Sequence, residues 1–485
     1  MKTLRIEDSI AAAAGLFPSE RGVVRELVEV WRRHKPNNER RESYYLEHVT
    51  QKSLGISVPP KLNVKASCGW PRKAVDYIAC RSQFDGYTTS DEAAAEVLRD
   101  VVARNDMKNA YHMAVTSQLV HCFTMLEVTD DDPDGEHRAL VTMTPATASA
   151  GIWDDRARQV EAGLAVVQCE RKNDVVKPTW VDVFMEDRWL EIRRVGGTWY
   201  LTHREATKMG RPLMEPMANE PTLMEPFGRS LITRSVRQLA DNYLRESVRS
   251  EVAAEFAASP QKYLLGASKK ALADESKYDA YIGSILAVSK DRDGDVPTFG
   301  QLSQPSMEPH ISYVRSLAAQ FSGETNVPLS ALGVVSDNPS SAEAIYATKE
   351  DAVMQVQRLN ALNKRSLVNV GWMALAIERN SDYETQRALV PDLNARFSNP
   401  AQPSVVSRSD AMVKQIGAIP WLGESDVALE ELGYDEEQIQ RLRSDKRAAE
   451  GKQLANAIVG SKSLVAQAQA LSAAPTPQLE EGGDV

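Results

Sequence analysis

The 485-residue sequence contains no uninterrupted apolar run of about 18 residues, the length that a membrane-spanning helix needs. We therefore expect no membrane span. Glu7 and Asp8 stand where a secretion signal would have only basic residues, so we expect no signal peptide either. Cysteine is scarce: the four cysteines form no CxxC pair and no Cys/His cluster with zinc spacing. The thiols are predicted to be free in a reducing cytoplasm.

The motifs that carry common enzyme chemistry are missing as well. The sequence has no GxxxxGKS/T phosphate loop, no GxGxxG fingerprint, no HExxH zinc motif and no GxSxG nucleophile elbow. Asp291, Asp293 and Asp295 resemble the start of a calcium loop. The later positions where such a loop needs Gly and Glu hold Val296 and Leu302. The sequence therefore predicts no cofactor, no metal site and no catalytic residue.

The charge balance argues against a protein that grips nucleic acid through its phosphates. The chain has 57 Lys and Arg against 67 Asp and Glu, a net charge of -10, and no dense basic run. Residues 409–443 resemble a helix-turn-helix, but Glu430, Glu431 and Asp435 stand where a reading helix needs Arg, Lys, Asn or Gln. If DNA meets this protein, we expect it to slide past, because like charges repel at short range. Taken alone, the acidic balance is the usual solubility charge.

Apolar periodicity predicts a mainly helical α+β fold with roughly two to four packed regions. Apolar residues that recur every three or four positions predict helices over 19–50, 91–122, 230–258, 309–321 and 342–378, and short helices over 405–457. Short β-rich runs, with turns at 132–135 and Gly196-Gly197, predict a small antiparallel β-meander over about 122–205. The proline-containing residues 210–228 are predicted to be extended, and the tail from Ser472 to be disordered.

The most informative stretch is residues 323–360. It places an apolar loop, centred on residues 329–335, between two predicted helices and directly before a long one. One interpretation is an ordinary helix connection packed on the core. The other is a loop that projects into a channel shared by several copies, where apolar contact would let a polyanion slip past.

Several short motifs occur in order along residues 20–445. Phe227-Gly-Arg-Ser230 opens a helix that ends in Ser259-Pro-Gln-Lys-Tyr-Leu-Leu-Gly266. The stretch from Leu317 to Pro328 leads through Ala331-Leu-Gly333 to Asn338-Pro-Ser-Ser-Ala-Glu-Ala-Ile345. Supporting matches are the region around Trp70, Arg81 and Asp85-Gly86, and the stretch from Lys414 to Pro420 with Leu432-Gly433. In this combination the chain resembles the portal proteins of tailed bacteriophages, of the siphophage type and especially those of actinobacterial phages.

The resemblance implies a portal fold with wing, stem, clip and crown regions. By position, residues 1–225 correspond to the wing, with its β-meander, and 342–389 to the long wing helix. Residues 226–258 and 306–323 correspond to two stem helices, 259–305 to the clip, and 324–341 to a tunnel loop. Residues 390–460 correspond to the crown and 461–485 to a flexible tail.

The resemblance also implies a function and partners. Portal proteins are non-enzymatic structural subunits, about twelve to a ring, that give the channel for DNA packaging and ejection at one capsid vertex of the virion. The implied partners are further copies of the chain, double-stranded DNA without sequence specificity, the terminase large subunit, the major capsid and scaffolding proteins, and the head–tail adaptor. Assembly would take place in the host cytoplasm.

Two alternatives remain open at this point. One is another structural or adaptor protein of a virion. The other is a phage DNA-processing enzyme, which would need clustered Asp and Glu for two metals, whereas the acids here are dispersed.

Two sets of residues are predicted to carry the portal role. The tunnel-loop set, expected near the constriction of the channel, is Leu329, Leu332, Val334, Val335, Ser336, Asp337 and Asn338. The stem set, expected to pair charges between neighbouring copies, is Arg234, Arg237, Arg245, Glu246, Arg249 and Glu251. Each exposed pair would add only about 0–1 kcal/mol.

Overall fold

The computed structural model describes residues 3–49, 66–131, 137–172, 175–258, 262–265, 298–301, 303, 306–334, 342–401, 405–434 and 438–452. The chain divides into two compact units, Met1–Ala401 and Gln402–Val485. The predicted turn at 132–135, the acidic segment at 291–295 and the tail from Ser472 lie outside the described residues. Over the described ranges, no helix combines the length and the hydropathy that crossing a bilayer requires.

The larger sheet of the first unit follows the predicted meander. Its strands β5 (Ser149–Asp154), β6 (Gln159–Lys172), β7 (Val175–Phe184), β8 (Arg188–Val195) and β9 (Thr198–Ala206) pair antiparallel in chain order. Gly196 and Gly197 both have positive φ at the β8–β9 turn, as a tight hairpin requires. β1 (Thr3–Leu4) pairs in parallel with β7, beyond the stretch that β8 covers.

A second sheet splits the region that the sequence predicted as one meander. β3 (Phe123–Asp130) lies between β4 (Ala139–Pro145) and β10 (Met214–Ala218). β10 forms in the stretch that was predicted to be merely extended. Pro216 fits there because β10 is an edge strand, whose outer side needs no donor. Met214 and Met217 are fully buried, so apolar burial holds the strand on the core.

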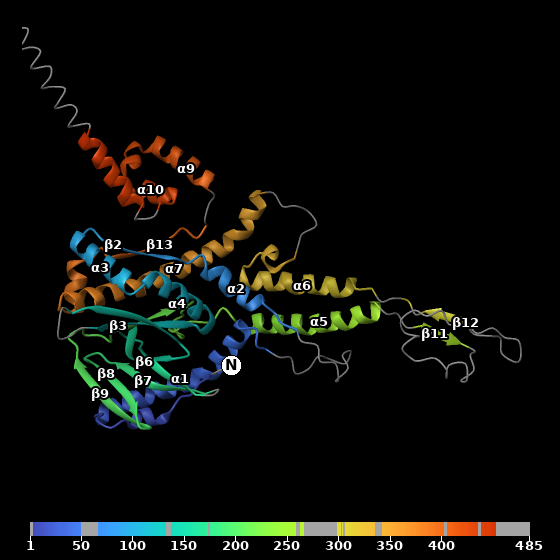
Figure 1. The fold of residues 1–485 in the computed structure, drawn as a ribbon, viewed down its shortest axis with the longest axis horizontal. Coiled ribbons are helices and arrows are strands. Elements are labelled where there is room, and N and C mark those ends of the chain that lie inside the picture. Colours follow the sequence, from blue (N-terminus) through green and yellow to red (C-terminus); the bar gives the residue numbers. More distant parts are fainter. Residues whose placement is uncertain are drawn as a thin grey trace, which may run out of the picture. The chain divides into compact units, whose positions relative to one another are not determined.

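One face of the larger sheet is covered by α1 (Pro18–Tyr45) and the short 3-10 helix η1 (Asp8–Ala12) (Figure 1). The apolar residues of α1 recur every three or four positions and are buried against this face. The resulting α1–sheet cluster includes Ile10, Val24, Leu27, Val28, Trp31, Leu164, Val183 and Trp199. The opposite face meets the second sheet, where Phe184 joins a larger cluster with Met125 and Met214.

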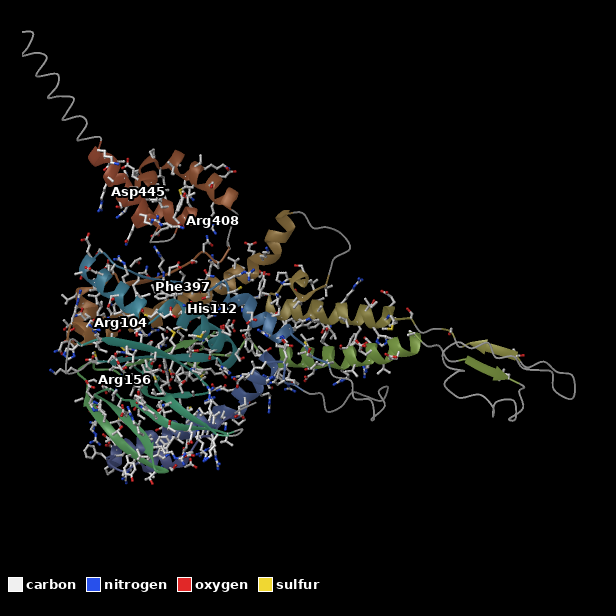
Figure 2. All side chains as sticks on the ribbon, viewed as in Figure 1. Arg104, His112, Arg156, Phe397, Arg408 and Asp445 are labelled. Carbon is white, nitrogen blue, oxygen red and sulfur yellow. The ribbon has the colours of Figure 1, made fainter. Side chains whose placement is uncertain are left out.

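The rest of the first unit is mainly helical. α7 (Ala342–Glu378) packs on α3 (Glu92–Arg104), α8 (Tyr383–Leu389), the second sheet and the strand pair β2 (Phe84–Thr88) with β13 (Asn394–Phe397). α2 (Trp70–Ala79) and α4 (Met107–His121) complete the layer. Arg104 pairs with Glu378, which joins the ends of α3 and α7 (Figure 2).

A hydrogen-bonded group lies inside this helical core. Gln118 and Asn363 exchange two hydrogen bonds: Gln118 Nε2 donates to Asn363 Oδ1 (2.7 Å), and Asn363 Nδ2 donates to Gln118 Oε1 (3.0 Å). Asn363 Nδ2 also donates to Tyr111 Oη (2.9 Å). Tyr111 Oη bonds Ser82 Oγ (2.8 Å), which donates to Asn360 Oδ1 (2.6 Å). All five residues are buried, so this α4–α7 network fixes α7 against α4 and the end of α2.

Several predicted helices differ from the observed ones in their limits. The helix predicted over 91–122 is two helices, because Asp106 has a φ of 47° and interrupts it. The helix predicted over 19–50 ends at Tyr45. The helices predicted over 230–258 and 309–321 are α5 (Arg234–Ala258) and α6 (Glu308–Thr325). Between them in sequence, β11 (Lys262–Leu265) pairs with β12 (Thr298–Gln301).

Within the second unit, short helices occur where the sequence predicts them. They are α9 (Val405–Ala418), the 3-10 helix η3 (Pro420–Glu424), α10 (Asp426–Leu432) and a helical stretch over residues 438–452. Ser425 Oγ accepts a hydrogen bond from the Val427 N–H (3.2 Å) and caps α10. Gly433, with a φ of 98°, ends that helix.

Candidate functional site

The two helices α5 and α6 pack side by side and form the first part of the candidate site (Figure 1). The buried apolar residues of α5 recur every fourth position: Val236, Ala240, Leu244, Val248 and Val252. Residues four apart lie on one face of a helix, so α5 turns a single apolar stripe toward the subunit. Its other faces carry mainly charged and polar residues.

α6 presents a matching stripe, and an aromatic residue from α2 lies against both helices. Leu317, Ala318 and Phe321 of α6 are buried. The Trp70 ring lies 4.3 Å from the Tyr243 ring of α5 and 5.4 Å from the Phe321 ring of α6, measured between centroids. Such aromatic pairs add about 0.5–1.5 kcal/mol beyond the area they bury. In the sequence, Trp70 is part of a short motif that supports the family resemblance. That motif did not predict the contact with α5 and α6.

The apolar stripe of α6 continues past the part that the subunit covers. Ile311 lies seven residues before Ala318 and therefore on the same face, yet 45% of it is exposed. Tyr313 is 43% exposed. The sequence predicted Ile311 as part of the packed face. The first turns of α6 thus leave apolar surface that the described residues of one copy do not cover.

The six predicted stem residues occupy different environments. Arg234 and Glu251 are exposed, whereas Arg237, Arg245 and Arg249 are half-buried. Glu246 is buried, and its carboxylate bonds His310 Nδ1 of α6 (2.5 Å) and lies 3.7 Å from the Arg249 guanidinium. In the described subunit, Glu246 therefore links α5 to α6 within one chain. An ion pair between any of these six residues and a neighbouring copy stays a prediction.

A second group of polar contacts ties α5 to α1. Tyr44 Oη donates to both carboxylate oxygens of Asp241 (2.9 and 3.0 Å). Burial and the hydrogen bond to Asp241 raise the pKa of Tyr44 to about 12. Burial, together with the nearby Arg41, lowers the pKa of Arg237. Arg237 NH1 donates to the Ile232 carbonyl (2.9 Å), so this predicted stem residue is positioned by its own subunit.

The loop after α6 is compact in its described part. Asn326, with a φ of 56°, ends α6, and Val327 is fully buried. The 3-10 helix η2 (Leu329–Leu332) follows and ends at Gly333, whose φ of 82° favours glycine. Leu329 is 39% exposed.

The predicted tunnel-loop residues are thus only partly accessible. Leu332 and Val334 are half-buried and pack against the main hydrophobic core. Leu329 is the most exposed of the apolar residues of this set in the described part. Val335, Ser336, Asp337 and Asn338 lie outside the described residues. The interpretation as a core connection therefore fits Leu332 and Val334, and the interpretation as a channel loop stays a prediction.

No group of three or more His, Cys, Asp or Glu side chains suited to a metal ion occurs in the part of the chain that the structure describes. The four cysteines are free. Burial raises the pKa of Cys68 to about 12, so this thiol stays protonated at neutral pH. The arrangement around α5, α6 and η2 offers apolar and charged surface.

Comparison with known proteins gives one family and two similar curated proteins. A family model described as phage portal protein, SPP1 Gp6-like, matches residues 25–451. The portal protein of Mycobacterium phage L5 is 24% identical over 462 residues, covering 91% of this chain and 92% of that protein. The portal protein of Mycobacterium phage D29 is 24% identical over 457 residues, with the same shares of each chain.

Among solved structures, the chain is similar to subunits of a gene transfer agent (GTA) particle. A chain of the neck of the empty GTA particle, computed with C6 symmetry, has a TM-score of 0.46 at 13% identity and covers 75% of this chain and 90% of that one. A chain of the virion of the native GTA particle has a TM-score of 0.43 at 13% identity, with 72% and 86% covered.

Proposed function

We propose, since this chain belongs to the phage portal protein family of the SPP1 Gp6-like type, that its copies close into a ring whose channel passes double-stranded DNA into and out of a capsid. The observation that carries the proposal is the family match over residues 25–451. It also confirms the resemblance seen in the sequence motifs. In this role the chain is a structural component of the virion, and a separate motor supplies the energy for DNA movement.

The helices α5 and α6 would form the wall of the channel. In a head-to-tail ring each subunit offers two different faces to its two neighbours. The exposed apolar residues Ile311 and Tyr313 and the exposed charges Arg234 and Glu251 are suited to such contacts, because they have no cover within one copy. Burying exposed apolar surface between copies stabilises a ring by about 25 cal/mol per Å² before the costs of association.

The remaining regions take their roles from the family. The β11–β12 hairpin would belong to the clip, since it lies between α5 and α6 in sequence, and would dock the terminase large subunit and later the head–tail adaptor. The sheets and α7 would form the wing, in contact with capsid and scaffolding proteins. The second unit, from Gln402, would belong to the crown.

The exposure of the described loop residues reduces the set that we propose to line the channel. Leu332 and Val334 contribute to the core, so their substitution would test folding as well as DNA passage. Leu329 is exposed and offers an apolar contact that a polyanion can slide past. We assign Leu329 to the channel lining, with Val335, Ser336, Asp337 and Asn338 completing the loop.

Electron microscopy of the purified chain tests the ring directly. We expect particles with a central hole and cyclic symmetry. A compact monomer or dimer under every assembly condition would contradict the proposal.

The uncovered stripe on α6 gives a sharper test. Ile311→Asp should abolish or strongly reduce ring formation without unfolding the subunit, because Ile311 is already 45% exposed. Leu389→Asp, at a leucine that is 62% exposed on α8, is the matched control and should leave assembly intact. If both variants assemble equally well, this face of α6 does not belong to the interface between copies.

The channel role is tested at Leu329. Leu329→Lys places a positive charge on an exposed position and should slow or stall DNA passage, because it adds an attraction for phosphates. Packaged genome length and retention measure the effect, with Leu389→Lys as the control. Unchanged packaging by Leu329→Lys in correctly assembled rings would exclude this residue from the channel lining.

A further inference from the structure

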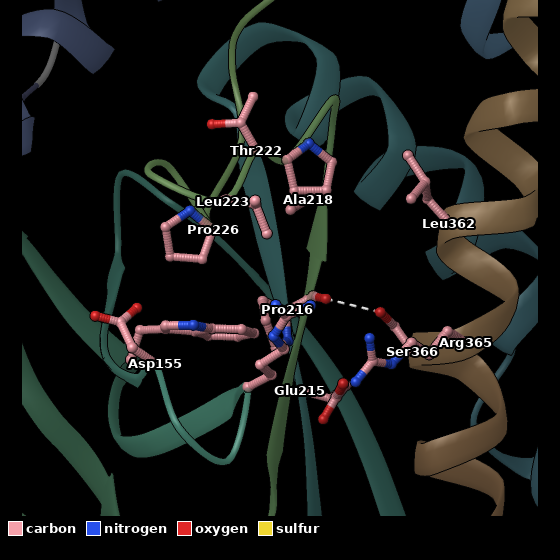
Figure 3. Close-up of a pocket in the computed structure, with 13 residues that line it drawn as sticks. Asp155, Glu215, Pro216, Ala218, Thr222, Leu223, Pro226, Leu362, Arg365 and Ser366 are labelled. Atoms are coloured by element: carbon pink, nitrogen blue, oxygen red, sulfur yellow. Dashed lines mark hydrogen bonds between the residues drawn. The ribbon is translucent and has the colours of Figure 1, made fainter.

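A cavity of about 590 Å³ lies beside α7, between the β5–β6 turn, β10 and α8. Five basic residues line it against two acidic ones. Arg158, Lys364 and Arg365 are exposed at its rim. Figure 3 shows an adjoining pocket, which shares Arg365 and Glu215 with this cavity. This local excess of positive charge stands out in a chain whose net charge is -10.

The floor of the cavity holds a buried arginine with an unused donor. Arg211 is 6% exposed, its terminal nitrogen pairs with Glu215, and its guanidinium lies 4.7 Å from the centre of the Tyr383 ring. The Arg211 Nε is buried and has no hydrogen-bond partner among the described residues. Because the Nε itself is closed off from solvent, Arg211 contributes positive charge to the cavity rather than a direct contact.

The positive charges around this floor outnumber the negative charges that line the cavity. Arg387 lies 3.4 Å from Glu384, and Arg211 pairs with Glu215. The side chains of Arg158 and Lys364 have neither a hydrogen bond nor an ion pair with any described residue, and Arg365 acts on Glu215 only through its charge. Burial raises the pKa of Glu215, and the positive charges of Arg211 and Arg365 oppose that effect.

We propose that this cavity binds an oxyanion, a carboxylate or a phosphate group. Arg158, Lys364 and Arg365 would bind the oxyanion from the rim, above the buried positive charge of Arg211. Charge-assisted hydrogen bonds from guanidinium groups suit both kinds of oxyanion. The group can come from a free phosphate ion or from an acidic side chain of a second copy of this chain. The site does not depend on the proposed channel.

Isothermal titration of the full-length chain with inorganic phosphate tests the proposal. We expect saturable binding to one site per chain, measured against chloride at the same ionic strength. Lys364→Ala with Arg365→Ala should weaken binding at least about tenfold, which corresponds to about 1.4 kcal/mol lost from the two contacts together. The control is Arg358→Ala, an exposed arginine two turns earlier on α7, which should leave the affinity unchanged.

The same titration distinguishes the two possible sources of the oxyanion, a free phosphate ion and a carboxylate of a second copy. Binding by both unassembled and assembled chains supports a free ion. Binding by unassembled chains only, with phosphate releasing assembled copies, supports a carboxylate from a second copy. No saturable binding by unassembled chains, a heat no different from that of chloride, or an equal loss in Arg358→Ala would overturn the proposal.

Discussion

The two main cores of the first unit are built on opposite principles. The α1–sheet cluster packs apolar side chains, with Trp31 and Trp199 among the largest, and the buried Glu20 of α1 pairs beside it with Arg188 and Arg204. The helical core around α4 and α7 encloses the five hydrogen-bonded residues of the α4–α7 network. Apolar contacts are non-directional and tolerate small shifts, whereas a buried hydrogen bond holds one geometry.

This difference suggests a division of labour. The α1–sheet cluster supplies free energy, and the α4–α7 network specifies where the long helix α7 lies. A portal subunit in a ring must place its elements reproducibly, so that identical contacts repeat around the axis. Four substitutions test whether the two cores differ in this way, and they are ordered here by the size of the expected effect.

The largest effect is expected in the apolar core. Trp199→Ala should lower the free energy of unfolding by about 3–5 kcal/mol, because it removes a side chain that is 1% exposed and leaves a cavity. Chemical denaturation monitored by circular dichroism measures the change. Tyr200→Ala, at the next residue of β9 where 43% of the side chain is exposed, is the control and should cost much less. Equal costs would show that the cluster does not carry the stability assigned to it.

The network should respond differently to single and double substitution. Asn363→Ala should cost about 2–3 kcal/mol, because it leaves the buried Gln118 amide unpaired and removes one of the two hydrogen bonds of Tyr111 Oη. Replacing both Asn363 and Gln118 by Leu should cost less than the single change, since fewer polar groups are then left unpaired. A double variant as unstable as the sum of its single variants would argue against a coupled network.

The contrast between the cores also explains how much of the fold the sequence predicts. Val24, Leu27, Val28 and Trp31 are close in sequence, so their spacing predicts the packed face of α1. The partners in the network are far apart: Gln118 and Asn363 are separated by 245 positions. Periodicity reports only local neighbours, so neither this network nor the pairing of β10 with β3 could be predicted from it.

The same limit applies to the candidate site. The motifs identified the family and the loop at 324–341. They did not predict how deeply each residue is buried. Glu246 was predicted as an inter-subunit residue because it lies on a charged face of α5, and its partner His310 is 64 positions away. The oxyanion cavity draws on residues from Arg158 to Asn394, a combination that no local pattern contains.

A buried carboxyl next to the apolar core should make stability depend on pH. Asp182 of β7 is 6% exposed and accepts a hydrogen bond from Trp180 Nε1 (2.7 Å). Burial raises the pKa of Asp182 from 3.8 to about 7. The folded state therefore keeps a proton that the unfolded state has already lost, and this contribution to stability falls as pH rises from about 4 to 7.

Asp182→Asn should remove that dependence. We expect the variant to equal the wild type near pH 4 and to be more stable than the wild type at pH 8, since an amide oxygen can still accept from Trp180. Unfolding midpoints measured across this pH range test it. The control is Asp155→Asn in the exposed β5–β6 turn, which should not change the slope. A variant with the wild-type slope would exclude Asp182 as the titrating group.

The smallest effect is expected at a helix end of the helical core. Asp91 Oδ1 accepts hydrogen bonds from the N–H groups of Ala93 (3.0 Å) and Ala94 (3.2 Å) and caps α3, and Arg379 lies 3.8 Å from its other oxygen. Asp91→Ala should cost about 1 kcal/mol, and Asp91→Asn much less, because the amide oxygen still caps the helix. An exposed ion pair adds at most about 1 kcal/mol. If both variants lose the same free energy of unfolding, the effect belongs to the Arg379 contact instead of the helix cap. Chemical denaturation of both variants therefore distinguishes the cap from the ion pair at this end of the core.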